Sequence, residues 1–491
     1  MRKIISILLF IAACGFANSQ GINNLWLLGY GYPQFGGGKM SIDFKYGFDS
    51  IYSTQRQMHF ATTNANISDS NGNLLFYTNG YYIANALGDT MLNGNNLVHN
   101  IWTQLDTIGE YSEQGALILP MPGDPNKYYL FHAPWEGQLQ DDWFYSIIDM
   151  AQDGGLGAVV SQNNVLVHDS VVRGKITACK HANGRDWWVI FPRFNSQIYY
   201  EFLVTPYGIL GPYMQNPGGA IRSSGGVGQS CFSPDGNKYA YYDPNSDLDN
   251  FDFDRCSGLL SNLIHVDIYD SADIGGVAFS PSSRLLYVSS NTFVYQFDLA
   301  AADVPASQTI VAVWDTFYSP SPPFAATFYL AWLAPDEKIY IICGNSTVDL
   351  HRINSPDSVG LACDFEQHSV HLPTYNAFTI PQNVNYFLAA DSSSVVCDSI
   401  NAISRDPQAF NQNVEIFPSP ASDLLYVRSI CKGERGSIYL FNVLGKKVES
   451  GIRHFENGEF IEIRVSDLSP GVYYLQLQNS SQSLVREFIK E

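Results

Sequence analysis

The stretch QSCFSPDGNKYAYYDP, from Gln229 to Pro244, decides the fold. It joins an apolar segment to an aromatic one through a short turn at Pro234, Asp235 and Gly236. Proline presets φ for such a turn, and glycine accepts positive φ without a Cβ clash. The stretch therefore predicts a β-hairpin.

Degraded copies of this hairpin recur along the chain and can be aligned on their turns. The turn markers are residues 71, 124, 183, 235, 282 and 336, so the spacings are 53, 59, 52, 47 and 54 residues, with a mean of 53. Each copy consists of short alternating runs rich in Tyr, Phe, Val and Ile, which favour strands. Third and fourth strands are expected behind the turns, as at Asn250 to Asp254 and Leu263 to Ile268. A fixed period of this length, with about four strands per unit, predicts the blades of an all-β fold, the β-propeller.

The number of blades follows from the length of the repeating body. Residues 20–390 comprise 371 residues, or seven periods of 53. We expect seven blades, the seventh composed of Leu25 to Tyr30 paired with Asn383 to Leu388, because that pairing leaves no open sheet edge at the chain ends. Six blades with irregular ends are the alternative.

The N-terminus resembles a secretory signal. Residues 1–19 contain Arg2 and Lys3, an apolar run, and small residues before Gln20. Cleavage after Ser19 is the favoured interpretation. The segment ending at Cys14 also resembles a bacterial lipobox, so lipidation of Cys14 is the competing interpretation. No other segment approaches the roughly 18 apolar residues of a membrane span, so none is expected in the mature chain.

The charge is strongly negative and unevenly distributed. The formal net charge is −20; residues 20–410 hold 16 basic and 37 acidic residues, and residues 411–491 hold 9 and 10. The body therefore carries −21 and the C-terminal part −1. Such a body repels phosphate backbones and anionic lipids, which argues against nucleic acid as a partner.

Seven cysteines remain if Cys14 leaves with the signal, and no C-x-x-C pair occurs among them. Disulfides are compatible with export, but an odd number leaves one thiol free. Cys363 and Cys397 flank the segment expected to close the ring, and we predict that they pair. The cysteines at 179, 231 and 343 lie in apolar strands and are expected to pack as small hydrophobic residues.

One acidic loop offers the oxygen ligands of a metal site. Asp243, Asn245, Asp247 and Asp249 alternate along it, and Ca²⁺ prefers six to eight oxygen ligands from a flexible segment. The EF-hand pattern is not met, because Leu248 occupies the position of the sharp-turn glycine. An acidic loop without a metal is the alternative, and no other cofactor is predicted. His368 and His371 are three residues apart, which places them on opposite faces of a strand and argues against a metal pair.

The repeating pattern ends near residue 390. Residues 391–413 are polar and Ser-rich, and we interpret them as a linker. Residues 414–491 contain about seven short alternating segments, including Ile461 to Val465, and predict a small, separate β-sandwich.

Three segments of this last part carry a family resemblance. They are EIFPSPASDLLYV from Glu415, IYLFNVLGKKV from Ile438 and LSPGVYYLQLQ from Leu468. Together they resemble the type A sorting domain of the type IX secretion system; the matching motif residues are Pro418, Pro420, Gly445, Gly471 and Tyr473. The family usually has Asn between the two prolines, where this chain has Ser419, which leaves the detail of that turn in doubt.

The resemblance implies export across the outer membrane of a Gram-negative, Bacteroidota-type cell by the type IX machinery. It also implies release from the cell or attachment to its outer surface. Segments of the body, such as SDSNGNLLFYTNG from Ser68, resemble uncharacterised propeller proteins that carry this sorting domain. That resemblance transfers no catalytic residue.

The function expected from these observations is binding. No G-x-S-x-G, H-E-x-x-H or P-loop motif occurs, and no catalytic residue is predicted. We expect a secreted or surface propeller that binds a glycan or protein without catalysis. The alternative is an extracellular hydrolase or lyase acting on a polymer, since paired carboxylates for such chemistry are compatible with 37 acidic residues but cannot be located from sequence.

Overall fold

The computed structural model describes most of the chain. The described residues are 21–31, 37–46, 50–97, 109–134, 139–222, 227–320, 323–391, 414–417, 421–429, 436–442, 448, 453–455, 460–479 and 483–490. The chain divides into two compact units, residues 1–389 and residues 390–491. The expected signal and nearly all of the expected linker lie outside the described residues.

The first unit consists of seven antiparallel sheets in the residues that the structure describes, and we call them blades 1 to 7. In each blade the spatial order of the strands follows their order in the sequence. Blade 1 is β1–β3, blade 2 is β4–β6, and blades 3 to 7 take four strands each from β7 onward. The strands are β1 Leu25–Leu28, β2 Lys39–Asp43, β3 Ser50–Thr54, β4 Ala65–Ser68, β5 Leu74–Thr78, β6 Ile83–Asn85, β7 Ala116–Pro120, β8 Lys127–His132, β9 Leu139–Asp149, β10 Ala158–Val172, β11 Thr177–Lys180, β12 Trp187–Pro192, β13 Tyr199–Thr205, β14 Gly208–Gln215, β15 Gln229–Phe232, β16 Lys238–Asp243, β17 Asp247–Phe253, β18 Leu260–Val266, β19 Gly275–Phe279, β20 Leu285–Ser290, β21 Phe293–Asp298, β22 Thr309–Val313, β23 Phe328–Leu333, β24 Ile339–Cys343, β25 Thr347–Ile353 and β26 Phe365–Asn376.

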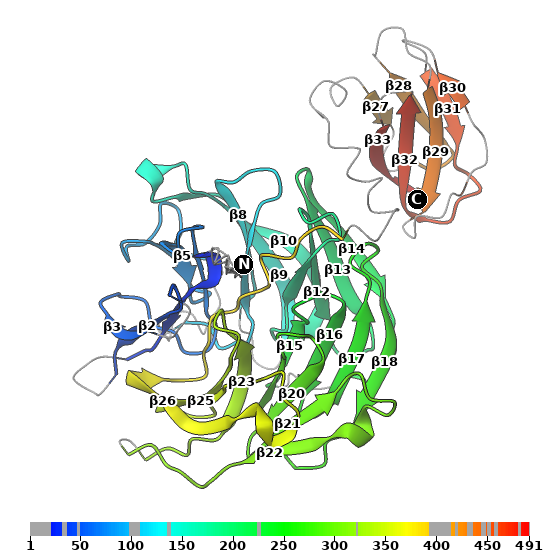
Figure 1. Cartoon of the computed structure of the whole chain (residues 1–491). Helices are drawn as coiled ribbons and strands as arrows, with labels where there is room; N and C mark the ends of the chain where they lie inside the picture. The colour runs from blue at the N-terminus through cyan, green and yellow to red at the C-terminus, as the bar shows by residue number, and fades with distance from the viewer. Residues whose placement is uncertain are drawn as a thin grey trace, which may run out of the picture. The chain divides into compact units, whose positions relative to one another are not determined.

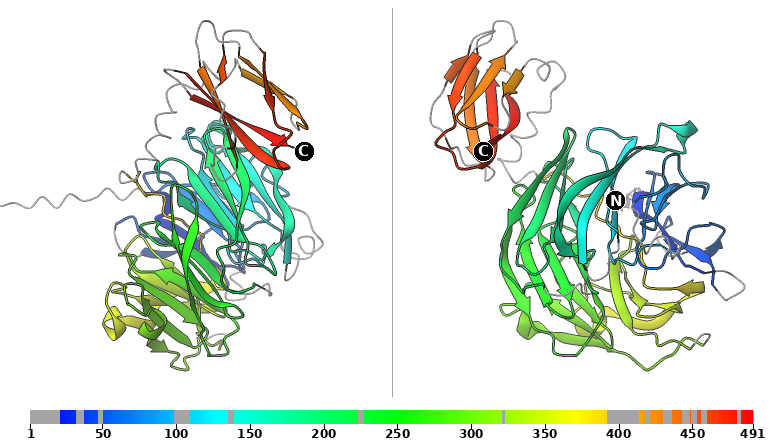
Figure 2. Two further views of the ribbon diagram at one scale, coloured as in Figure 1. Left: turned by 90° about the vertical axis from the view of Figure 1, so that its right-hand side faces the viewer. Right: turned by 180° about the vertical axis from the view of Figure 1, so that it is seen from behind.

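The blades form a closed ring, which confirms the predicted β-propeller. The first strands of successive blades contact each other; for example, β1 contacts β4, and β15 contacts β19. At the closure of the ring, β26 of blade 7 contacts β2 and β3 of blade 1. Figure 1 shows the blades around this ring, and Figure 2 shows them from two further sides. Four short 3-10 helices occur in the described residues: η1 Gly21–Asn23, η3 Asp153–Gly155, η4 Pro305–Ser307 and η5 Gly360–Cys363. Nowhere in the described part of the chain is a helix long and apolar enough to cross a bilayer.

All six predicted turns join the first and second strands of a blade, in blades 2 to 7. In the hairpin that decides the fold, the N–H of Gly236 donates to the carbonyl of Ser233 at 2.8 Å. Gly236 has φ +75°, and a Cβ there would lie 2.9 Å from the side chains of Arg255, Cys179 and Leu388. Both the backbone angle and the close approach of neighbouring blades therefore require glycine.

The ring closes differently from the expectation. Leu25–Leu28 pairs with Lys39–Asp43 inside blade 1, and residues 383–388 form no strand. The predicted pairing of the two chain ends is therefore wrong. Blade 1 is built entirely from N-terminal residues, because β2 and β3 supply its remaining strands.

The segment 377–389 instead lies inside the ring (Figure 1, gold). The N–H of Gln382 donates to the carbonyl of Asn64, next to blade 2, at 3.0 Å. Tyr386 Oη donates to the carbonyl of Ile118 in blade 3 at 3.0 Å, and Asn385 Nδ2 donates to that of Pro234 in blade 5 at 2.7 Å. Trp332 Nε1 of blade 7 donates to the carbonyl of Asn383 at 3.2 Å. A single segment with partners in so many blades can lie only within the ring that they surround.

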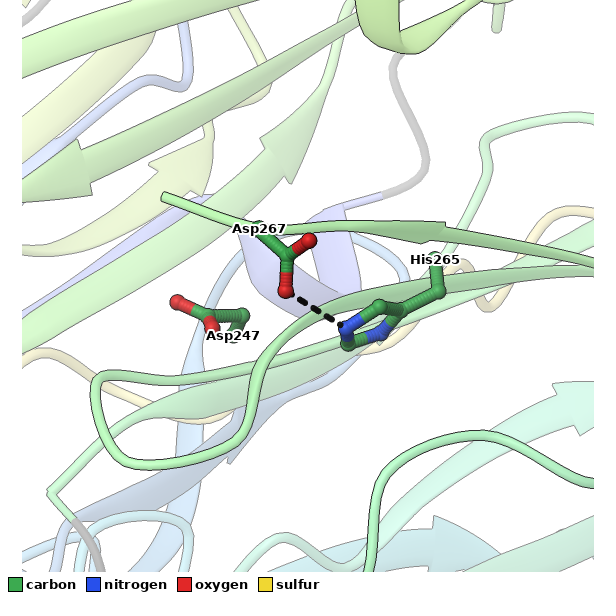
Figure 3. Close-up of side chains that lie close together, drawn as sticks. All are labelled: Asp247, His265 and Asp267. Atoms are coloured by element: carbon green, nitrogen blue, oxygen red, sulfur yellow. Dashed lines mark ion pairs between the residues drawn. The ribbon is translucent and has the colours of Figure 1, made fainter. Parts of the chain in front are cut away.

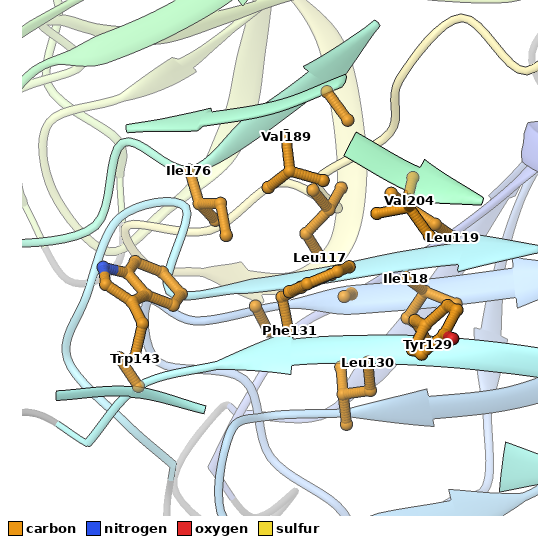
Figure 4. Packing of buried hydrophobic residues seen from close by; sticks show 14 of the residues in the cluster. Leu117, Ile118, Leu119, Tyr129, Leu130, Phe131, Trp143, Ile176, Val189 and Val204 are labelled. Atoms are coloured by element: carbon orange, nitrogen blue, oxygen red, sulfur yellow. The ribbon is translucent and has the colours of Figure 1, made fainter. Parts of the chain in front are cut away.

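Large apolar side chains pack between neighbouring blades. The ring centroids of Trp143 in blade 3 and Phe191 in blade 4 lie 5.3 Å apart. Figure 4 shows the cluster to which they belong, where Leu117 and Phe131 of blade 3 approach Val189 of blade 4. Aromatic and aliphatic residues thus fill the space between these blades, where burial of such surface stabilises by roughly 25 cal/mol per Å².

The cysteines differ in part from the prediction. Cys179, Cys231 and Cys343 are free thiols packed in or against the strands, as expected. Cys363, at the end of η5, is also free and is buried in the cluster between blades 6 and 7. Cys363 is therefore not in the predicted disulfide with Cys397, which lies outside the described residues. Cys256 is disulfide-bonded.

The second unit is a two-sheet β-sandwich, as predicted. Its sheets have the strand orders β27-β28-β31 and β30-β29-β32-β33. The strands are β27 Val414–Phe417, β28 Leu424–Ser429, β29 Gly436–Asn442, β30 Arg453–Phe455, β31 Phe460–Arg464, β32 Gly471–Asn479 and β33 Ser483–Lys490. Leu425, Leu440 and Leu475 are buried between the sheets.

Two of the predicted sorting-motif residues lie in this sandwich. Gly471 begins β32, and Tyr473 stacks on Phe488 and donates from Oη to the carbonyl of Ser469 at 2.9 Å. Tyr473 thus fixes the turn before β32 to the core. Pro418, Pro420 and Gly445 lie outside the described residues.

Tyr386→Ala should destabilise the propeller by about 3 to 5 kcal/mol, because it empties a buried aromatic site and removes a hydrogen bond inside the ring. Unfolding in denaturant can be followed by tryptophan fluorescence, since all eight tryptophans lie between residues 26 and 332. The neighbouring Phe387→Ala, at a side chain that is 39% exposed, is the matched control and should change stability little. Equal effects of the two substitutions would contradict the assigned place of this segment.

Candidate functional site

The antiparallel order of the blades gives the ring two distinct faces. Turns between first and second strands, and between third and fourth strands, lie on one face, which we call the turn face. Connections from one blade to the next lie on the other, which we call the connection face. Residues 267–274 and 314–327 are two such connections, joining blades 5, 6 and 7.

The four predicted calcium ligands lie at the connection-face end of blade 5 but have separate partners. Asp243 is buried and accepts the N–H of Asn245 at 2.8 Å, whereas Asn245 itself is exposed. Asp247 accepts the N–H of Ile268 at 3.2 Å. Among the described residues, the carboxylates of Asp243, Asp247 and Asp249 do not form a set within metal-binding distance of one another. The three carboxylates are thus held by different partners, and the calcium loop stays a prediction.

Asp249 is held by a buried arginine. Arg222 Nη2 lies 2.9 Å from Asp249 Oδ2, and the two side chains are 0% and 1% exposed. The guanidinium lies between the rings of Tyr199 and Tyr241, 4.5 and 4.7 Å from their centroids. The N–H of Ala220 also donates to Asp249 Oδ2 at 3.1 Å. The pair thus fastens the connection between blades 4 and 5 to the third strand of blade 5.

A second group forms beside this pair, from Asp247, His265 and Asp267 (Figure 3). One ligand atom of each residue lies within 4.8 Å of the others. His265 Nδ1 lies 2.7 Å from Asp249 Oδ1, and its Nε2 lies 3.3 Å from Asp267 Oδ1. Burial lowers the pKa of His265, but the hydrogen bond and charge of Asp249, followed by those of Asp267, outweigh it and raise that pKa overall. Burial raises the pKa of Asp247, and the charge of Asp267 adds to this effect.

The centre of the connection face holds further buried charges. Arg173 Nη2 lies 3.0 Å from Glu113 Oε2, next to the starts of β11 and β7. Burial lowers the pKa of the adjacent Lys175 to about 8, against the opposing effect of Glu113. Gln114 and Lys175 have φ of +53° and +64°, in a region that costs non-glycine residues of order 1–3 kcal/mol. Gln114 is held there by a reciprocal pair of hydrogen bonds with the backbone of Ser230, at 2.7 and 2.8 Å.

Exposed aromatic rings lie on the connections between blades. Tyr269, in residues 267–274, is 92% exposed, and Tyr318, in residues 314–327, is 53% exposed. Tyr269 is bracketed by anchored neighbours: Ile268 is buried, and Asp270 accepts hydrogen bonds from Ser290 and, at 3.0 Å, from Tyr295 Oη. The ring of Tyr269 is thus displayed by a tethered loop.

Sequence reasoning missed a repeated cross-strand pair. An Asp in the third strand lies opposite a His in the fourth strand of blades 3, 5 and 7. The pairs are Asp142–His168, Asp249–His265 and Asp349–His371, with Nδ1 to Oδ1 distances of 2.6, 2.7 and 2.7 Å. His368 contacts Asp315 instead, so His368 and His371 have different partners. No local signal identifies these pairs, because bulges shift the register between the strands that carry them.

Comparison with known proteins identifies the C-terminal unit. Residues 415–491 match a family described as a secretion system C-terminal sorting domain. No curated protein matches the chain.

Solved structures similar to the chain have low sequence identity. A putative 6-phosphogluconolactonase from Bacteroides fragilis has 11% identity and a TM-score of 0.42, over 74% of this chain and 99% of the other. A gluconolactonase from Xanthomonas campestris has 13% identity and a TM-score of 0.32, over 64% and 91%. The Dos1 propeller has 12% identity and a TM-score of 0.36, over 66% and 91%. Similarity at this level says nothing about activity.

The ring of blades and the matched domain define the class: a β-propeller protein with a C-terminal sorting domain. That domain belongs to the type IX secretion system. The protein is therefore exported to the cell surface or the extracellular space.

Arg222→Met should destabilise the propeller by about 3–5 kcal/mol, because it leaves the buried Asp249 without its countercharge. Arg284→Met is the matched control: Arg284 also pairs with an aspartate, Asp298, but its side chain is 55% exposed, and little change is expected. Denaturant unfolding monitored by tryptophan fluorescence measures both. A small effect of Arg222→Met would show that the connection to blade 5 is held by other contacts.

Proposed function

We propose that the propeller is a non-enzymatic binding module whose ligand is a glycan held on the connection face. The observation that carries this proposal is the display of Tyr269, a 92% exposed aromatic ring on a loop tethered at both neighbouring positions. A ring whose loop is already fixed loses less conformational freedom on binding than a mobile one, which favours affinity. A flat aromatic face offers a stacking surface to a sugar ring at little cost in side-chain entropy.

The surrounding chemistry supports a polyhydroxylated ligand. Asp267, whose side chain is 55% exposed, flanks Tyr269, and ionised carboxylates accept hydrogen bonds from hydroxyl groups. The formal net charge of −20 disfavours anionic polymers. Neutral or basic glycans are therefore the ligand class that fits best.

The central charged groups support binding rather than polymer cleavage. Glu113 is nearly buried and paired with Arg173, and Asp243 is buried against its own turn. Neither carboxylate is presented to a large substrate. A polymer-degrading hydrolase or lyase, the alternative function, would have to use other acid and base groups on this face.

Tyr269→Ala should weaken binding of the recognised glycan at least tenfold, because the stacking surface is lost. A glycan-array screen of the full mature chain identifies the ligand, and calorimetry measures the change. Tyr207→Ala is the matched control, since Tyr207 is 59% exposed on the turn face and should leave affinity unchanged.

Turnover assays on the bound glycans complete this test. Product released in less than stoichiometric amount from each bound polymer is expected. Repeated turnover would replace the binding proposal with the hydrolase or lyase, and equal losses for the two tyrosines would refute the assigned face.

Deleting residues 414–491 should leave the propeller folded but in the periplasm. The propeller should fold because residues 1–389 form a compact unit with a core of their own. The same segment fused to a signal-bearing reporter should carry the reporter to the surface or the medium. Cell fractions with and without a working type IX system measure both. Equal surface delivery of full-length and truncated protein would contradict the role of this segment.

A further inference from the structure

We propose that Asp247, His265 and Asp267 form a binding site for a divalent transition-metal ion of the Zn²⁺ class. This metal site does not require a bound glycan, although its Asp267 also flanks Tyr269, and its ligand set differs from that of the predicted calcium loop. Asp247 is the only residue that belongs both to this metal site and to the four predicted calcium ligands.

The three side chains come from the ends of two paired strands. Asp247 begins β17, and His265 and Asp267 lie at and just beyond the end of β18, which pairs with β17. Figure 3 shows the carboxylate of Asp267 facing the imidazole of His265, with Asp247 beside them. Their ligand atoms lie within 4.8 Å of one another, and metal bonds of about 2.0–2.2 Å would draw them closer by side-chain rotation. Asp247 and His265 are held on strands, which fix side chains more rigidly than loops do, and Asp267 lies on the connection that follows β18.

The histidine is oriented as metal-binding histidines usually are. Its Nδ1 lies 2.7 Å from Asp249 Oδ1, and Asp249 is itself fixed by the buried Arg222. A carboxylate at Nδ1 keeps the proton of the neutral ring there and leaves the lone pair on Nε2 for a metal. Asp249 lies outside the three ligands, so this hydrogen bond is evidence separate from their proximity.

The contact on the other ring nitrogen also calls for a cation. With the proton on Nδ1, the Nε2 lone pair and Asp267 Oδ1 are two acceptors only 3.3 Å apart, with Asp247 alongside. A proton on Nε2 or a metal ion would satisfy them. A proton bridges only two of these atoms, whereas a metal ion can bridge all three groups.

The donor set selects the class of metal. One imidazole nitrogen and two carboxylate oxygens suit Zn²⁺ and similar ions, whereas Ca²⁺ prefers six to eight oxygens. The side chains of His265 and Asp267 are 35% and 55% exposed, so solvent can reach the ion and complete its coordination. Bound metal would join the end of blade 5 to the loop that carries Tyr269.

The test is titration of the full mature chain, without a histidine tag, with Zn²⁺ alone at pH 7.5. We expect one high-affinity site per chain and a rise in melting temperature with Zn²⁺. His265→Ala and Asp267→Asn should each weaken this site at least tenfold. Asp267→Asn preserves shape at an exposed position, so it keeps the test valid if His265→Ala destabilises the fold.

His371→Ala is the matched control. His371 has the same 2.7 Å contact with an aspartate, Asp349, but belongs to no three-residue metal group among the described residues. It should leave the affinity unchanged. Unaltered Zn²⁺ binding in His265→Ala and Asp267→Asn, or tighter binding of Ca²⁺ than of Zn²⁺ at these residues, would overturn the proposal. Tyr269→Ala should retain Zn²⁺ binding, which separates failure of this site from failure of the glycan proposal.

Discussion

The ring depends on apolar packing between blades that lie at opposite ends of the chain. Trp26 of blade 1 and Phe44, which follows β2, contact Tyr340 of blade 7, with ring centroids 5.7 and 5.6 Å from that of Tyr340. Met40 and Ile42 of β2 join the same cluster as Leu330 and Ile342. Because blades 1 and 7 share no strand in the described residues, this contact and the segment inside the ring replace the strand pairing that would otherwise close it. The closure is therefore a matter of side-chain complementarity.

Inside the ring, polar groups are tolerated because they satisfy one another. Segment 377–389 donates and accepts hydrogen bonds at the inner ends of several blades, so its backbone is not left unpaired in a buried place. Arg222 and Asp249 follow the same principle with charges, since a buried ion is stable only beside a partner and further donors. Removing both charges from water costs free energy, so a buried ion pair needs good geometry and further hydrogen bonds. Here the Arg222–Asp249 pair fixes both the connection to blade 5 and the ring of His265.

The sequence predicts those features that local chemistry determines. Turn residues such as Pro234 and Gly236 indicate a hairpin from local chemistry alone. The spacing of the six turns then predicts the strands that follow them and the seven blades. The predicted pairing of the two chain ends is wrong because the sequence does not mark the turn inside blade 1. Its first connection, residues 29–38, contains no Asn-Gly or Asp-Gly pair. The predicted pairing of Cys363 rests on its position in the sequence, next to the segment expected to close the ring. That position does not show that the side chain is buried in a core.

The candidate sites depend on register, which the sequence does not contain. Asp249 and His265 meet because β17 and β18 align them, and the register of these strands shifts by a bulge between Asn250 and Asp252. A one-residue error in that alignment moves a side chain to the other face of the sheet. Alternating oxygens therefore suggested a calcium loop, whereas the fold sends Asp243 into the interior and Asp249 to Arg222.

The loop of residues 267–270 is where the two proposed sites meet. Asp267 faces His265, Ile268 is fixed to Asp247 through its N–H, and Asp270 is fixed to blade 6, which leaves Tyr269 as the residue that projects. Each tether limits the conformations of the loop before any ligand binds, and preorganisation of this kind lowers the entropic cost of binding. An ion held by Asp247, His265 and Asp267 would add one more tether on the side of blade 5. The same short loop would then couple the metal content of the propeller to the rigidity of the exposed ring of Tyr269.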